Sequence, residues 1–126
     1  MSALYGDLIA EHYRRPRNKG ALARADLAHE GVNPLCGDRV RLELRVERGR
    51  IAEAGFSGDA CMVATASASL LTERLRGLLL AEAAQVSRDE VLAALQTTLR
   101  PARVSCALLP LDVLRAALAL DSGGRA

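Results

Sequence analysis

The sequence RVRLELRVERGRI at residues 39–51 decides the fold class. Its apolar residues alternate strictly with charged residues, which is typical of a strand with one buried and one solvated face. Arg48 and Gly49 then predict a turn, and residues 51–56 predict the returning strand of a β-hairpin. A weaker strand is expected at residues 25–32, so we predict a small sheet of about three antiparallel strands.

The segments around this hairpin predict helices. Pro16 ends the first of them, Gly77 provides a left-handed stop for the second, and Ser87 with Glu90 predicts a capping box at the start of the third. Because the strands precede most of the helices, we expect an α+β fold with helices packed on one face of the sheet, forming a single domain over residues 1–126. The expected helices cover residues 3–13, 61–77, 87–95 and 110–120.

Composition narrows the class of protein. Half of the 126 residues are hydrophobic, but Tyr5, Tyr13 and Phe56 are the only aromatic ones, so the core must consist of aliphatic side chains. A net charge of +2 with so few aromatic residues argues against a nucleic-acid partner. No apolar run approaches the roughly 18 residues that span a bilayer, and the N-terminus lacks the features of a signal peptide. We therefore expect a cytoplasmic protein with no membrane partner.

Three cysteines stand where the backbone is expected to bend: Cys36 in NPLCGD, Cys61 in FSGDAC and Cys106 in PARVSCALL. In the cytoplasm thiols stay reduced, so an odd set of three is a poor disulfide framework. Cys36 lies in a turn, with Asp38 two residues later, whereas Cys106 is expected just before the last helix. Each cysteine taken alone is equally compatible with a small core residue.

Together the cysteines indicate a metal or sulfur site. Asp59 is the expected N-cap of the second helix, which places Cys61 at a helix start that favours a thiolate. The hairpin should bring Cys36 and Cys61 to the same end of the sheet. Arg103 could stabilise a thiolate or persulfide on Cys106 through its charge. Three sulfurs and one carboxylate would suit a tetrahedral zinc site or one side of an iron–sulfur cluster.

The remaining polar residues carry weaker signals. His12 and His29 are expected at surface or partly buried positions rather than as ligands. A cysteine enzyme with Cys–His chemistry would need one of them beside a thiol. A purely structural zinc domain is a further alternative. A solvated surface is predicted for the basic segment that contains Arg14, Arg15, Arg17 and Lys19.

Four motifs in order resemble the U-type iron–sulfur cluster assembly proteins, IscU and SufU. They are LYGDLIAEHYRRPRNKGAL, NPLCGD, GDAC followed by ATASASLLTE, and PARVSCALLPLDVLRAAL, and they extend from residue 4 to about residue 118. The resemblance implies that zinc or a nascent [2Fe–2S] cluster binds Cys36, Asp38, Cys61 and Cys106. It also implies a scaffold or sulfur acceptor rather than an enzyme. A pyridoxal-phosphate cysteine desulfurase would deliver sulfur as a persulfide on Cys36 or Cys106, and downstream proteins would accept the cluster.

The chain combines features of two branches of that family. IscU-type members carry a histidine immediately before the third cysteine, where this chain has Ser105. The ARVSCALL stretch resembles the SufU type, whose members tend to hold zinc tightly and accept sulfur. SufU-type members usually carry an insertion between the second and third cysteines, and the separation of Cys61 and Cys106 is too short to include it. The sequence therefore leaves the choice open between a cluster scaffold and a zinc-dependent sulfur acceptor.

Overall fold

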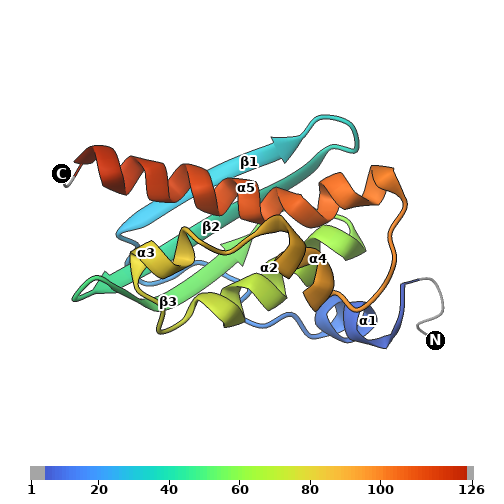
Figure 1. Ribbon diagram of the computed structural model, residues 1–126, viewed down its shortest axis with the longest axis horizontal. Coiled ribbons are helices and arrows are strands. Elements are labelled where there is room, and N and C mark those ends of the chain that lie inside the picture. The colour runs from blue at the N-terminus through green and yellow to red at the C-terminus, as the bar shows by residue number, and fades with distance from the viewer. Residues whose placement is uncertain (1–4, 125–126) are drawn as a thin grey trace.

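A three-stranded antiparallel sheet and a layer of helices make up the fold (Figure 1). The structure is a computed structural model that describes residues 5–124, with side chains up to residue 120. The strands follow the order β1–β2–β3. In chain order the elements are α1 (Asp7–Arg14), β1 (Leu27–Asn33), β2 (Asp38–Glu47), β3 (Arg50–Ser57), α2 (Met62–Leu75), α3 (Leu80–Ala83), α4 (Arg88–Ala94) and α5 (Pro101–Gly124).

The alternating residues of β2 direct one face of the sheet to the core, as predicted. Val40, Leu42 and Leu44 are at most 1% exposed. Arg48 and Gly49 both have positive φ, which gives the two-residue turn the twist that suits a hairpin. A register shift between Arg45 and Val46 marks a bulge near that turn. The opposite face carries charged residues in ion pairs, namely Arg39–Glu30, Arg41–Glu43 and Arg45–Glu53.

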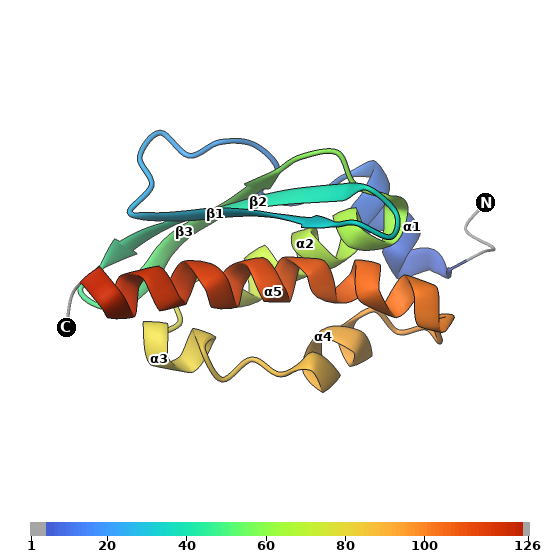
Figure 2. The same ribbon diagram turned by 90° about the horizontal axis from the view of Figure 1, so that it is seen from above.

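The helices cover the apolar face of the sheet, which confirms the predicted α+β architecture. Figure 2 shows α2 and α5 beneath the sheet, with α3 and α4 farther out on the same side. Leu75 of α2 and Leu114 of α5 are fully buried in the same core cluster as Leu42 and Leu44. Burying such a side chain contributes about 1.5–3 kcal/mol, so this layer holds the sheet in place. Among the described residues, every helix is too short or too polar to span a bilayer.

The last helix begins earlier than the sequence indicated. We predicted its start at Pro110, but α5 begins at Pro101 and contains Pro110 in its interior. Proline is favoured in the first turn of a helix, where its missing N–H is not needed, and both prolines could meet that description from sequence alone. Pro110 cannot donate a hydrogen bond to the carbonyl of Cys106 one turn earlier. Because α5 begins at Pro101, Cys106 lies inside the helix and not before it.

Two of the predicted helix signals have different outcomes. Ser87 and Glu90 form the expected capping box: Glu90 N–H donates to Ser87 Oγ over 3.1 Å, and Ser87 N–H donates to Glu90 Oε1 over 3.3 Å. Asp59 is not the N-cap of α2, because Cys61 occupies that position. The first helix begins at Asp7, and residues 3 and 4 of its predicted range lie outside the described residues.

The basic segment that begins at the end of α1 is only partly a solvated surface. Arg14, Arg15 and Lys19 are exposed, as predicted. Arg17 is half-buried, and its guanidinium forms an ion pair with Glu11 over 3.2 Å. The chain then pairs with the edge of β3, where Phe56 N–H donates to the carbonyl of Asn18 and its own carbonyl accepts from Gly20 N–H. The segment thus anchors α1 to the sheet.

His12 is buried, although the sequence predicted a surface or partly buried position. Its Nδ1 lies 2.7 Å from Ser69 Oγ, and that oxygen also accepts the backbone N–H of Arg17 over 2.8 Å. This network ties α1 to α2 and lies apart from the three cysteines. His29 lies on β1 and is half-buried.

We expect the free energy of unfolding to fall as the pH drops below 6.5. Burial, followed by the nearby Arg17 charge, lowers the pKa of His12 below its ordinary 6.5, despite opposing contributions from Glu73 and Glu11. The unfolded chain then binds a proton more readily than the folded one, so stability is lost as the pH falls through this window. Urea unfolding above and below pH 6.5 measures the effect. A His12→Gln variant with an unchanged pH dependence would show that His12 is not its source.

Candidate metal and sulfur site

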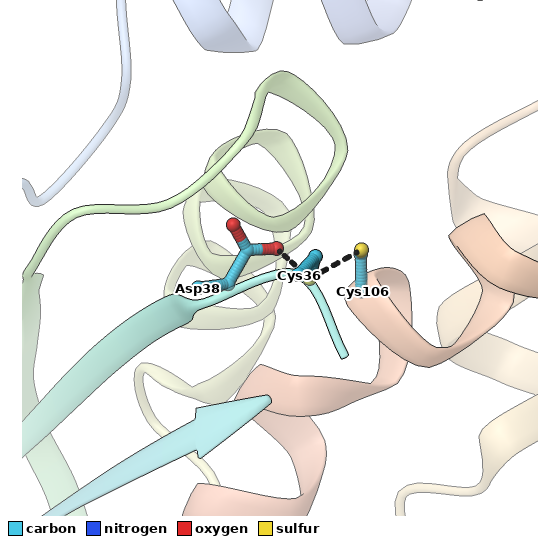
Figure 3. Close-up of side chains that lie close together, drawn as sticks. All are labelled: Cys36, Asp38 and Cys106. Atoms are coloured by element: carbon cyan, nitrogen blue, oxygen red, sulfur yellow. Dashed lines mark hydrogen bonds between the residues drawn. The ribbon is translucent and has the colours of Figure 1, made fainter. Parts of the chain in front are cut away.

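The turn between β1 and β2 presents Cys36 and Asp38 toward α5 (Figure 3). Cys36 lies in the four-residue loop that follows Asn33, and Asp38 is the first residue of β2. Asn33 and Asp38 face each other as the last pair of β1 and β2, so the pairing of these strands closes the loop that carries Cys36. Cys106 faces the loop from the second turn of α5.

Two thiols and one carboxylate converge at this point. The Cys36 Sγ lies 3.3 Å from the Cys106 Sγ, and it donates a hydrogen bond to Asp38 Oδ2 over 3.1 Å. One ligand atom from each of the three residues lies within 4.8 Å of the others. Residues 70 positions apart in the chain therefore meet in a geometry that a single metal ion could bridge.

Asp38 also connects the two loops at this end of the sheet. Its side chain is buried, and Oδ1 accepts the backbone N–H of Cys61 over 2.9 Å. Burial by itself would raise the pKa of the Asp38 carboxyl, but the hydrogen bonds from Cys36 and Cys61 outweigh burial and hold the pKa below its usual value. The carboxyl group is thus kept ionised, the form in which it could bind a metal.

Cys61 borders the group but does not join it. Its Sγ accepts the N–H of Ala64 over 3.5 Å and so caps α2. The sulfur still lies near enough to Asp38 and Cys106 to affect their pKa values. The structure thus places Cys36 and Cys61 at the same end of the sheet, where Arg39 N–H also donates to the carbonyl of Asp59. Using the Cys61 sulfur as a ligand would replace its bond with Ala64.

The two facing thiols differ sharply in exposure. Cys36 is exposed at the loop, whereas Cys106 is 1% exposed. Burial, together with hydrogen bonds to Cys36 and Asp38, raises the pKa of the Cys106 thiol well above its ordinary range. A bound metal ion would reverse this preference, because a coordinating thiol is deprotonated. Of this facing pair, Cys36 is therefore the thiol that a protein partner could reach directly.

Arg103 lies one turn before Cys106 on α5, and its Nη1 is 3.9 Å from the Cys106 Sγ. The neighbouring Cys106 raises the pKa of the guanidinium further, so Arg103 supplies a permanent positive charge at the sulfur. A cavity of about 550 Å³ opens here, and both Cys36 and Cys106 line it together with Arg100, Arg103 and Leu35. A larger groove of about 1190 Å³ lies near the β2–β3 turn and contains none of the cysteines.

Asn33 is a part of the site that sequence reasoning missed. It is the last residue of β1, and its side chain is buried between the Cys36 loop and α5. The signal was present, because Asn before Pro commonly starts a turn by accepting backbone N–H groups. Its contact with α5 had no signal in the sequence, since residues 33 and 105 are brought together only by the fold.

These features define a class: a small α+β domain that gathers soft and hard metal ligands at one end of a three-stranded sheet. Residues 4–121 match the NifU-like N-terminal domain family. The chain therefore belongs to this family of U-type iron–sulfur cluster assembly scaffolds, as the four motifs indicated.

Individual relatives cover nearly the whole chain. The zinc-dependent sulfurtransferase SufU of Bacillus subtilis is 32% identical over 141 aligned positions, which cover 98% of this chain and 95% of the relative. The iron–sulfur cluster assembly enzyme IscU of Drosophila melanogaster is 37% identical over 122 positions, which cover 93% and 77%. Among solved structures, the N-terminal part of a nitrogen-fixing NifU-like protein from Brucella abortus has a TM-score of 0.76 at 19% identity, over 98% of this chain and 96% of that one. This last likeness supports the fold alone.

Proposed function

We propose that this protein accepts sulfur from a pyridoxal-phosphate cysteine desulfurase and assembles a [2Fe–2S] cluster on Cys36, Asp38, Cys61 and Cys106. The observation that carries the proposal is the meeting of Cys36, Asp38 and Cys106 at one point, with Cys61 beside them. Downstream proteins would then take the cluster. The reduced thiols that this role requires fit a cytoplasmic location.

The donor set fits both zinc and iron. Thiolates bind either metal, and a single carboxylate adds a harder ligand that exchanges more readily than sulfur. A bound zinc ion would hold the thiols deprotonated and screen their charges from one another. Cys36 and Cys106 would be the principal ligands, Asp38 the exchangeable one, and Cys61 the residue whose sulfur must leave its helix cap to take part.

Exposure favours Cys36 over Cys106 as the first sulfur acceptor. The Cys36 thiolate would attack the outer sulfur of the persulfide on the desulfurase, and the desulfurase cysteine would leave as a thiolate. This exchange needs no external oxidant or reductant, because one S–S bond forms as another breaks. Arg103 would stabilise the sulfur anion at Cys106 when sulfur reaches that position. Reducing the transferred sulfur to sulfide would require two electrons from a separate reductant.

A second function is favoured by a specific observation. The Bacillus subtilis relative, named a zinc-dependent sulfurtransferase, covers 98% of this chain, and Ser105 provides no imidazole beside Cys106. The protein would then carry zinc at the same residues, stimulate the desulfurase by accepting persulfide sulfur, and never hold a cluster. Both functions use Cys36 as the acceptor, and they differ in what occupies the site afterwards.

Anaerobic reconstitution separates these two functions. The full chain would be purified without oxygen, analysed for zinc, iron and sulfide, and then incubated with cysteine and a cysteine desulfurase, first without and then with iron and a reductant. A visible chromophore that requires the three cysteines would support the cluster scaffold. A mass gain of one sulfur atom with retained zinc and no chromophore would support the sulfur acceptor. Neither a persulfide nor a chromophore would contradict both proposals.

A further inference from the structure

Asn33 uses its side chain to join the Cys36 loop to α5. Its Oδ1 accepts the N–H of Leu35 over 3.1 Å, and its backbone carbonyl accepts the N–H groups of Cys36 and Gly37. On the other side, its Nδ2 donates to Ser105 Oγ over 3.1 Å and lies 4.0 Å from the Cys106 Sγ. One buried amide thus contacts the segments that carry both facing thiols.

Ser105 completes the connection from the helix side. Its Oγ accepts the Asn33 amide and donates to the carbonyl of Ala102 over 2.9 Å. The hydroxyl is therefore hydrogen-bonded within its own helix while it accepts the hydrogen bond from Asn33, the residue before the Cys36 loop. Because Ser105 immediately precedes Cys106, a bond at Ser105 fixes the position of the neighbouring thiol relative to the loop.

We propose that Asn33 is a positioning residue of the metal and sulfur site, acting through Ser105 to set the distance between the Cys36 and Cys106 sulfurs. Together with the contact between the two thiols, this bond connects the Cys36 loop to the second turn of α5. Ser105 thereby gains a role in this chain although it supplies no metal ligand. The inference rests on the proposed function insofar as the positioned thiols bind metal and sulfur.

Zinc affinity provides the first test, measured by competition with a chelator on the full chain. Ser105→Ala removes the acceptor of the Asn33 amide and leaves all proposed ligands in place. We expect it to weaken zinc binding about tenfold, the lower end of the effect of groups that orient metal ligands. Ser105→Thr keeps the hydroxyl and should retain affinity close to that of the parent. Ser57→Ala is a control for the loss of a hydroxyl, because Ser57 is the last residue of β3 and pairs with Arg41 rather than with the Cys36 loop or α5.

A double-mutant cycle tests whether the two residues act as one connection. Asn33→Ala should weaken binding at least as much as Ser105→Ala, because it also removes the bond to Leu35 N–H. Adding Ser105→Ala to the Asn33→Ala variant should then cause little further loss. Thermal unfolding of each variant shows whether the fold persists. If the Asn33→Ala variant is less stable, the cycle still tests the proposal, because the further effect of Ser105→Ala is measured between two proteins that both carry Asn33→Ala.

The separation of the thiols provides a readout that needs neither desulfurase nor metal. In metal-free protein equilibrated with a glutathione redox buffer, the Cys36–Cys106 disulfide should be about fivefold less favoured in Ser105→Ala, the effect expected for one hydrogen bond. A parent that binds no zinc would count against the zinc-dependent function, yet this equilibrium would still test the positioning role. Equal zinc affinity and equal disulfide equilibrium in parent and Ser105→Ala would overturn the proposal. So would failure of Ser105→Thr to retain the parental values.

Discussion

Replacing Cys36 with serine should abolish persulfide formation when the protein is incubated anaerobically with a cysteine desulfurase and cysteine. Cys36 is the exposed thiol of the facing pair, whereas Cys106 is 1% exposed. A serine hydroxyl does not ionise near neutral pH and cannot attack the sulfane sulfur, so the loss should be essentially complete. Intact-protein mass spectrometry measures the result as the absence of a one-sulfur mass gain.

Cys106→Ser is the control that assigns the order of the thiols. Each of the two variants removes one proposed metal ligand, so both should lose metal. Only Cys36→Ser should lose the first transfer of sulfur from the desulfurase. The Cys106→Ser variant should still gain one sulfur atom on Cys36. Persulfide on Cys106 of the Cys36→Ser protein at the parental rate would show instead that the buried thiol receives sulfur directly. That outcome would require the Cys36 loop to open when the desulfurase binds.

The sheet was predictable because a single physical requirement determines its pattern. Val40, Leu42 and Leu44 alternate with charged residues, and this period of two fits only a strand with one buried face. The start of α5 was not predictable in the same way. Pro101 and Pro110 both suit a first helical turn, and only packing of the full helix against β1 and β2 makes the interior proline tolerable.

The candidate site was predictable in part for a related reason. The turn before β2 and the helix start after β3 are joined by the hairpin, so the proximity of Cys36 and Cys61 follows from local connectivity. Cys106 comes from a distant segment, and its 3.3 Å approach to Cys36 depends on how α5 crosses the sheet. The same crossing creates the contact between Asn33 and Ser105, which no spacing in the sequence encodes. Side chains that position ligands in this way can be identified only once the packing of the helix on the sheet is known.

Asp38→Ala should produce a more persistent cluster on reconstitution, together with altered zinc retention. The proposed carboxylate ligand is the hardest donor in a site otherwise made of sulfur, and its exchange would open a coordination position for release. Zinc affinity should change by about tenfold or more, the scale known for groups that tune a metal site. Decay of the visible chromophore with an acceptor protein and zinc competition with a chelator measure the two effects. Parental values for both would show that Asp38 is not a functional ligand.

Asp38 has a second role that the experiment must separate from ligation. Its Oδ1 accepts the backbone N–H of Cys61, so the alanine variant also loosens the start of α2. Asp38→Asn keeps an oxygen for that hydrogen bond but removes the negative charge and much of the affinity for a metal. If cluster lifetime increases in both variants, the charge and its ligation control release. If it changes only in Asp38→Ala, the connection between the two loops is responsible, because that bond is the feature that asparagine preserves.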